Sequence, residues 1–152
     1  MSIKKWWIAS SLLLAFAACT VSKPAATSLD HIALYTQNLK TSTHFYQHVL
    51  GLDTIPEPFH DGKHTWFTVG GGAALHLIVG LGAPVAQNKN THLCFRKASL
   101  QPLIERLVAA GVPYEDWAGT PSSITTRVDG VHQIYFKDPD GHWIEVNDAR
   151  NR

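Results

Sequence analysis

The amino-acid sequence predicts an α+β fold made of two tandem βαβββ modules, at about residues 29–80 and 90–148. Two pairs of segments are imperfect copies of each other and occur in the same order in both halves of the chain. The matching segments are 29–34 with 90–95, and 66–76 with 135–145. Such a duplication is typical of a small structural unit that occurs twice, and the two curved sheets are expected to form a cleft.

The first module begins with a strand and continues with a helix. Residues 29–36 alternate in polarity and contain Ile, Leu and Tyr, which predicts a strand. A helix is expected from Asn38 to about Leu50, because Asn is a favoured N-cap and Gly51 is a favoured terminator. Three short strands are expected to follow, at residues 52–56, 64–70 and 73–79.

The second module repeats this order of elements. Residues 91–96 predict a strand in which Cys94 is expected to be a buried thiol. A helix is expected at Ser99–Ala110, capped by its serine and ended by Gly111. The Gly/Ser/Thr/Pro-rich segment 118–126 predicts a loop that could cover a site. The remaining strands are expected at residues 113–117, 131–137 and 142–147.

The N-terminus has the pattern of a bacterial export signal. Two lysines and an apolar run are followed by small residues, so residues 1–18 are predicted to be a signal peptide. Cys19 stands directly after them and resembles the lipidated cysteine of a lipobox, which implies a tether at residues 19–28 and a domain at 29–150. The protein is therefore expected in the periplasm, anchored to a membrane only through Cys19, with secretion in soluble form as the alternative.

The charge balance argues against one class of partner. The formal net charge is +1 at pH 7, and the sequence has no basic run and no interleaving of basic and aromatic residues. Nucleic acid is therefore not an expected partner, and the expected partner is a small-molecule substrate.

The duplicated segments place ionisable side chains at equivalent points, because His31 aligns with His92 and His76 aligns with Glu145. Alternate residues of a strand share a face, so these side chains are expected on the open face of each sheet. Their apolar neighbours are expected under the helices: Ile32, Leu75, Leu77, Leu93, Phe95, Ile144 and Val146. A glutamate in that position needs a counter-charge, which a metal provides. Three imidazoles and one carboxylate suit one divalent ion of Zn, Ni, Fe, Mn or Co per site.

Four phrases of the sequence resemble one known superfamily. They are LDHIAL at 29–34, FYQHVLGL at 45–52, THLCF at 91–95 and YFKDPDGHWIEVND at 135–148. They resemble the vicinal-oxygen-chelate superfamily, whose fold is that of glyoxalase I, bleomycin-resistance proteins and extradiol dioxygenases. The resemblance implies a metal held by the first and last strands of each module, and hence by His31, His76, His92 and Glu145. Glyoxalase I more often has Glu where this chain has His76.

The resemblance also implies an activity. In a glyoxalase I-like lyase or isomerase, a metal binds two neighbouring substrate oxygens and stabilises the developing negative charge. Glu145 would act as the base that moves a proton between adjacent carbons of a small α-hydroxycarbonyl or thiol adduct. The alternatives are a fosfomycin-type thiol transferase, an extradiol-type dioxygenase, and a non-catalytic binding or resistance protein. The transferase and dioxygenase branches would use only His31, His92 and Glu145.

Other residues are candidates for the substrate pocket. His64 and Trp66 lie where the superfamily lines its pocket, with a solvated hairpin loop as the alternative. Tyr135 matches a tyrosine of the fosfomycin transferases. Arg127 could pair with an anionic group of the substrate, with an exposed loop arginine as the alternative.

A homodimer is the expected assembly. The connection between the strand of His76 and the strand of His92 is short. This favours pairing each module with the other module of a second chain, as in glyoxalase I, which would give a C2 dimer with two shared sites.

Overall fold

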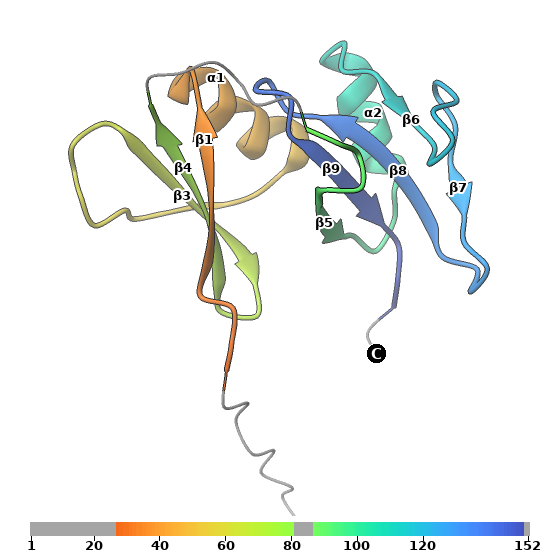
Figure 1. Ribbon diagram of the computed structural model, residues 1–152, viewed down its shortest axis with the longest axis horizontal. Coiled ribbons are helices and arrows are strands. Elements are labelled where there is room, and N and C mark those ends of the chain that lie inside the picture. The colour runs from red at the N-terminus through yellow and green to blue at the C-terminus, as the bar shows by residue number, and fades with distance from the viewer. Residues whose placement is uncertain (1–26, 81–86, 151–152) are drawn as a thin grey trace, which may run out of the picture.

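The computed structural model describes residues 27–80 and 87–150, which form two mixed sheets lying side by side (Figure 1). The first module comprises β1 (His31–Thr36), α1 (Leu39–His44), η1 (Phe45–Leu50), β2 (Thr54–Ile55), β3 (His64–Gly70) and β4 (Ala73–Val79). The second comprises β5 (His92–Arg96), α2 (Gln101–Ala109), β6 (Tyr114–Glu115), β7 (Thr125–Thr126), β8 (His132–Lys137) and β9 (Trp143–Asn147). The predicted signal peptide and Cys19 lie outside the described residues.

The two sheets have the same topology. The strand order is β1-β4-β3-β2 in the first sheet and β5-β9-β8-β6 in the second, with β7 paired to β8. In each sheet the first strand of the module runs parallel to the last, and the remaining pairs are antiparallel. This arrangement confirms the predicted α+β fold of two tandem βαβββ modules.

The helix of the first module changes its hydrogen-bond pattern halfway along. Asn38 caps it as expected, because its Oδ1 accepts a hydrogen bond from the backbone N–H of Thr41 at 3.1 Å. The chain is α-helical in α1 and π-helical in η1, a change that the apolar pattern does not predict. Gly51 ends the helix with a left-handed φ of 78°, and its N–H bonds to the carbonyl of Tyr46.

Two details of the second module differ from the prediction. The helix α2 begins at Gln101 instead of Ser99, because Pro102 occupies the first turn, where its fixed φ suits a helix start. The predicted cap by Ser99 was wrong, because the N-cap residue is Leu100, which makes no side-chain cap bond. The Ser99 hydroxyl accepts the N–H of Gln101 at 3.3 Å from one residue further out. The predicted loop 118–126 contains the short strand β7, which pairs with β8.

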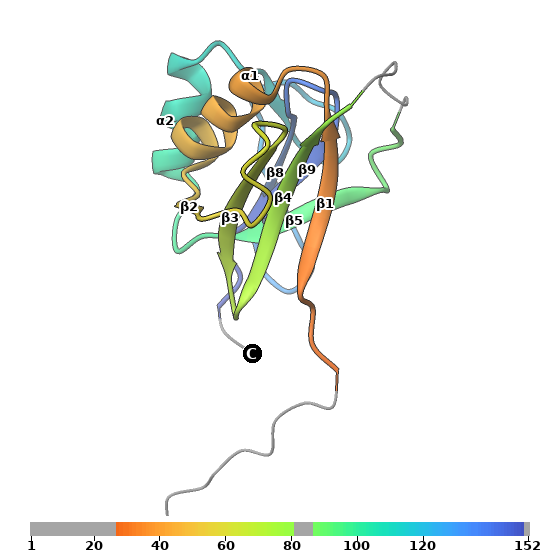
Figure 2. The same ribbon diagram turned by 90° about the vertical axis from the view of Figure 1, so that its left-hand side faces the viewer.

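One hydrophobic core holds both modules together. The helices lie against the same side of the sheets (Figure 2), and the buried core contains residues of α2, η1 and strands of both sheets. The apolar neighbours of the predicted ligands all belong to this core or pack against it, as expected: Ile32, Leu75, Leu77, Leu93, Phe95, Ile144 and Val146. Packing these residues under the helices leaves the opposite faces of both sheets for polar side chains.

A buried polar turn also joins the modules. Asp140, in the turn between β8 and β9, accepts hydrogen bonds from the backbone N–H of Gln37 at 2.8 Å and from the Ser42 hydroxyl at 2.6 Å. Asp138 accepts a hydrogen bond from the Tyr46 hydroxyl at 2.8 Å. Burial raises the pKa of Tyr46, and the carboxylate of Asp138 raises it further, so this hydroxyl remains a donor.

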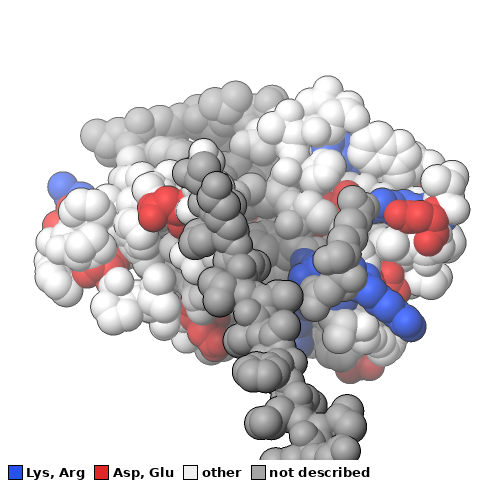
Figure 3. Space-filling model, turned by 90° about the horizontal axis from the view of Figure 1, so that it is seen from below, with Lys and Arg blue, Asp and Glu red and all other residues white. Residues whose placement is uncertain are grey.

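The described surface carries charges of both signs. On the face seen from below, basic side chains lie mainly on the side of the second sheet, and acidic side chains lie on both sides (Figure 3). Neither helix in residues 27–80 and 87–150 has the length and apolar character needed to cross a membrane.

Candidate metal centre

The parallel strand pairs present the predicted ligands in the same way in both modules. In the pairing of β1 with β4, His76 lies opposite Ala33, which is two residues after His31. In the pairing of β5 with β9, Glu145 lies opposite Cys94, which is two residues after His92. The repeat seen in the sequence is therefore also a repeat of strand register.

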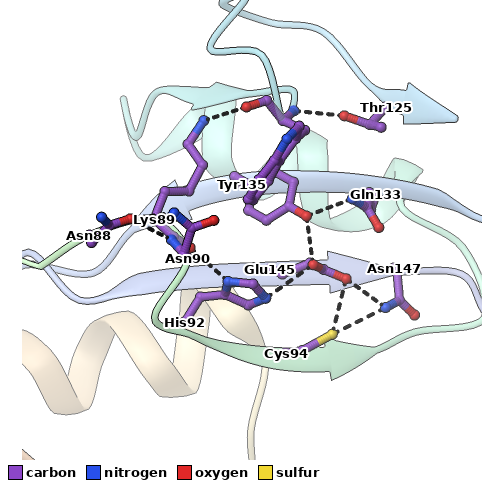
Figure 4. A network of polar contacts seen from close by, with 11 residues as sticks. Asn88, Lys89, Asn90, His92, Cys94, Thr125, Gln133, Tyr135, Glu145 and Asn147 are labelled. Atoms are coloured by element: carbon purple, nitrogen blue, oxygen red, sulfur yellow. Dashed lines mark hydrogen bonds and ion pairs between the residues drawn. The ribbon is translucent and has the colours of Figure 1, made fainter. Parts of the chain in front are cut away.

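Glu145 is the centre of a buried polar network on the second sheet (Figure 4). Its Oε2 accepts a hydrogen bond from the Tyr135 hydroxyl at 2.6 Å and lies 3.2 Å from Nε2 of His92. Its Oε1 accepts hydrogen bonds from the Asn147 amide at 2.9 Å and from the Cys94 thiol at 3.2 Å. Side chains from three strands thus converge on one carboxylate.

These neighbours determine the ionisation of Glu145. Burial alone favours the neutral acid, but hydrogen bonds from Tyr135, Asn147 and Cys94 outweigh burial and lower the pKa of Glu145. Burial raises the pKa of Tyr135, and its bond to Glu145 raises it further. Glu145 is therefore a carboxylate at neutral pH, and Tyr135 is a neutral hydrogen-bond donor.

The far side of the His92 ring fixes its orientation. Nδ1 of His92 lies 2.7 Å from the backbone carbonyl of Lys89, which can only accept a hydrogen bond, so Nδ1 carries the hydrogen. Nε2 is left facing Glu145. A nitrogen lone pair facing a carboxylate oxygen is unfavourable unless a proton or a metal cation lies between them. The donors of this pair therefore fit a bound metal.

The side chain of Lys89 connects the segment before β5 with the loop after β6. Its ammonium group forms an ion pair with Glu115 and donates to the backbone carbonyls of Asp116 at 3.1 Å and Trp117 at 3.3 Å. The carbonyl that orients His92 is thus held in place by the side chain of the same residue.

The prediction that Cys94 is a buried thiol was wrong. Cys94 is exposed, on the same face of β5 as His92. Partial desolvation and the carboxylate of Glu145 raise the pKa of the Cys94 thiol to about 12. The thiol therefore stays protonated and donates to Glu145. The error arose because an apolar strand was read as buried on both faces.

The first sheet carries a second cluster, which consists of imidazole rings. The ring centroids of His31 and His76 are 5.9 Å apart, and Nε2 of His76 lies 2.7 Å from Nδ1 of His64. Nδ1 of His31 lies 2.6 Å from the carboxylate of Asp30. Burial lowers the pKa of His76, and the neighbouring His64 and His31 lower it further, so His76 is neutral.

Aromatic rings surround His76. The Trp66 ring lies 4.4 Å from His76, centroid to centroid, and the Phe59 ring lies 4.5 Å from His64. Among the described residues, Nε1 of Trp66 is the buried side-chain nitrogen that has no hydrogen-bond partner. Phe59 is 54% exposed, so it forms the outer wall of this cluster.

The two pairs of predicted ligands form separate half-sites. We call His31 with His76 the first half-site, and His92 with Glu145 the second. Within residues 27–80 and 87–150, no group of three or more His, Cys, Asp or Glu side chains is arranged to hold a metal ion. The described residues thus bring the four predicted ligands together only in pairs.

The candidate pocket residues divide between the half-sites. His64 and Trp66 contact His76, and Tyr135 contacts Glu145. The Arg127 guanidinium donates to Asp129 at 2.7 Å, and its positive charge acts on the thiol of Cys94 beside the second half-site.

The roles of Lys89 and Asn147 were not predicted from the sequence. Asn147 lies two residues after Glu145 on the same face of β9, so strand alternation could have indicated it. Nothing in the sequence marks the carbonyl of Lys89 as a partner of His92.

The two βαβββ modules have equal strand register. Each carries an imidazole on its first strand and an ionisable side chain on its last strand. The fold and the site therefore define a duplicated-module protein with paired half-sites. The chain matches the family model of the Glyoxalase/Bleomycin resistance protein/Dioxygenase superfamily over residues 28–146, and it belongs to that superfamily. This match confirms the resemblance seen in the sequence motifs.

The relatives of the chain include two types of enzyme. The chain is 29% identical over 126 residues to "Glyoxylase I 4" of Arabidopsis thaliana, covering 79% of this chain and 70% of that protein. It is also 29% identical over 123 residues to "Metallothiol transferase FosB" of Shouchella clausii, covering 78% of each. The solved structure of "Oxidase ChaP-H2" superimposes with a TM-score of 0.66 at 23% identity, covering 83% of this chain and 96% of that one. The last likeness bears on the fold alone.

Proposed function

We propose that this protein is a metal-dependent enzyme of the superfamily, a glyoxalase I-like lyase or isomerase of a small α-hydroxycarbonyl or thiol adduct. The observation that carries the proposal is the second half-site. A buried carboxylate and an imidazole nitrogen face each other at 3.2 Å, and both are oriented by partners on their far sides. Catalytic metal ligands typically have such outer partners.

The residues proposed to hold a divalent transition metal are His31, His76, His92 and Glu145. This donor set is too rich in nitrogen for Mg or Ca, and it suits Zn, Ni, Fe, Mn or Co. When bound, the metal supplies Lewis-acid stabilisation to two neighbouring oxygens of the substrate.

Glu145 is the proposed proton carrier. Its lowered pKa keeps it in the carboxylate form, which is the form that accepts a proton. It takes a proton from the carbon next to the substrate carbonyl and returns it to the adjacent carbon. Tyr135 and Asn147 hold the two oxygens of Glu145 in place, which limits the reorganisation needed at each transfer.

We propose that each complete site is shared between two copies of the chain. The first and second half-sites lie on different sheets, and one copy offers no cluster of three ligands in its described part. A C2 dimer that sets the first half-site of one copy against the second half-site of the other makes two equivalent sites.

Two measurements test the enzyme proposal. Elemental analysis of the purified protein should give close to one transition metal per chain, and His92→Ala should lose it. The metal-loaded protein in deuterated water should exchange the α-hydrogen of a hemithioacetal or a free α-hydroxycarbonyl. If the wild type contains no metal, the enzyme proposal is rejected in favour of a non-catalytic binding protein.

A thiol transferase of the fosfomycin type is the second candidate. It is favoured by the Tyr135 hydroxyl, which lies 2.6 Å from Glu145 at a position where such enzymes carry a tyrosine. Thiol addition to an epoxide by the metal-loaded protein, without any α-hydrogen exchange, would select this candidate. Oxygen consumption with a catechol would instead select a dioxygenase.

We also propose that the protein is a periplasmic lipoprotein anchored through Cys19. The support is the pattern of residues 1–18 followed by that cysteine. Cells grown with an alkyne-labelled fatty acid should label the wild type and not Cys19→Ser. Label in both proteins, or in neither, would reject lipidation at this position.

A further inference from the structure

Two of the three histidines proposed as ligands have one ring nitrogen held by an acceptor. Nδ1 of His31 lies 2.6 Å from the Asp30 carboxylate, and Nδ1 of His92 lies 2.7 Å from the Lys89 carbonyl. Neither acceptor can donate a hydrogen, so each Nδ1 carries a hydrogen, and Nε2 is the ring nitrogen that can coordinate a metal. Histidine ligands of metals are usually oriented by such a bond on the nitrogen away from the metal.

The third histidine, His76, is held by another imidazole. Its Nε2 lies 2.7 Å from Nδ1 of His64, so one hydrogen is shared between two nitrogens. Nε2 of His64 faces the Asp61 carboxylate at 3.4 Å. A carboxylate attracts the N–H of His64, which leaves Nδ1 of His64 as an acceptor. His76 then donates through Nε2, and its own Nδ1 keeps the free lone pair.

The second module explains why a histidine is needed here. Trp66 lies opposite His76 in the first sheet, just as Tyr135 lies opposite Glu145 in the second. The Tyr135 hydroxyl bonds directly to Glu145, whereas Nε1 of Trp66 is buried without a partner. The indole therefore cannot orient its opposite residue by a hydrogen bond.

We propose that His64 is a positioning residue of the metal site, and that it orients His76 so that Nδ1, not Nε2, is its coordinating atom. This inference rests on the proposed function, because it concerns one of the proposed ligands. His64 occupies the position that aligns with Gln133 in the second module, where the side chain bonds to Tyr135. The first module thus uses His64 in place of the tyrosine hydroxyl.

The first test uses the metal-free protein. Long-range 1H–15N NMR spectra of the imidazoles should show His76 as the Nε2–H tautomer in the wild type. His64→Leu should convert His76 to a mixture of tautomers. A fixed Nε2–H tautomer of His76 in His64→Leu would overturn the proposal. This readout does not need metal, so it remains decisive even if the wild type binds none and the proposed function fails.

The second test measures affinity for Zn²⁺ by competition with a chromophoric chelator. Loss of an outer partner typically weakens metal binding about 10- to 100-fold, and this is the loss expected for His64→Leu. His64→Gln should restore most of the affinity, because its amide oxygen can accept the N–H of His76. His60→Leu is the matched control, since the His60 side chain is 81% exposed and faces Glu57.

A double substitution separates positioning from other roles. If His64 acts only through His76, then His64→Leu should cause no further loss of Zn²⁺ affinity in a His76→Ala background. An additional loss of 10-fold or more there would mean that His64 binds the metal itself, and the positioning role would be rejected. Unchanged affinity of His64→Leu in the wild-type background would reject it as well.

Discussion

Glu145 is proposed to act both as a metal ligand and as a base, and a substitution that changes one atom of its carboxylate separates the two roles. A ligand needs an oxygen lone pair, whereas a base needs a negative charge that accepts a proton. In the structure the same carboxylate faces His92 and accepts bonds from Tyr135, Asn147 and Cys94.

Glu145→Gln should therefore keep part of the metal and lose proton transfer. The amide oxygen still coordinates weakly, but the amide cannot accept the substrate proton. Exchange of the substrate α-hydrogen with deuterated water should fall by about 10²- to 10⁴-fold. NMR of the substrate measures the exchange, and elemental analysis measures the metal. Glu105→Gln on α2 is a matched control, and equal exchange in the two variants would contradict the assignment of the base.

The residues of the half-sites were predicted to different degrees. Strand alternation and the internal repeat placed His92 and Glu145 on one face of one sheet, where the structure has them. The contact of His64 with His76 was not predictable, because it depends on the diagonal packing of β3 on β4. The exposure of Cys94 was not predicted, because its burial was inferred from the apolar composition of the strand. The alternation of side chains between the two faces of the strand was the better guide.

Among the elements, the turn between β8 and β9 is the main polar link between the modules. Asp140 in this turn accepts two hydrogen bonds from the first module, from the N–H of Gln37 and the hydroxyl of Ser42. Asp140→Ala removes two hydrogen bonds to a charged acceptor, but the Ser42 hydroxyl keeps Thr36 as a partner at 2.7 Å and Gln37 is exposed to water. The free energy of unfolding should therefore fall by about 1–3 kcal/mol in total. Urea denaturation measures the free energy of unfolding. The exposed Asp53→Ala should change stability by less than about 0.5 kcal/mol.

The same turn makes stability depend on pH. The hydrogen bond between His142 and Asp138, 2.8 Å long, raises the pKa of His142 despite partial burial, and the charge of Asp140 adds to this. The stabilisation is complete below the unfolded pKa of about 6.5 and is lost as the pH rises through the higher folded pKa. Thermal denaturation should show the difference in Tm between wild type and His142→Gln shrinking across that interval. Asp138→Asn should remove the same pH dependence. If the difference in Tm between wild type and His142→Gln instead grows with pH, the hydrogen bond between His142 and Asp138 is not its cause.

The order and type of the elements were largely predictable from local pattern. Asn38 and Gly51 bound the first helix as expected, because capping is a property of single residues. The π-helical turn of η1 and the strand β7 were not predicted. Both depend on packing and pairing with distant segments, which apolar periodicity does not record.

At the scale of the whole molecule, mixing two inactive variants distinguishes shared sites from sites within one chain. His31→Ala disables the first half-site and His92→Ala disables the second. If sites are shared, a mixed dimer has one intact site, built from the undamaged half of each copy. Co-refolding equal amounts should restore metal to about a quarter of the wild-type level, since half of the dimers are mixed and each has one of two sites. No recovery, with a monomer mass by light scattering, would place each site within one chain.

The unlike chemistry of the two half-sites has a consequence for the handedness of the product. The first sheet contributes imidazole rings that pack against Trp66 and Phe59, and the second contributes the carboxylate of Glu145. In the proposed shared site, a substrate held between them would meet a base from one side only. A proton would be removed from one carbon and delivered to the adjacent carbon on the same face of the substrate, and a product with a new stereocentre would be released as one enantiomer.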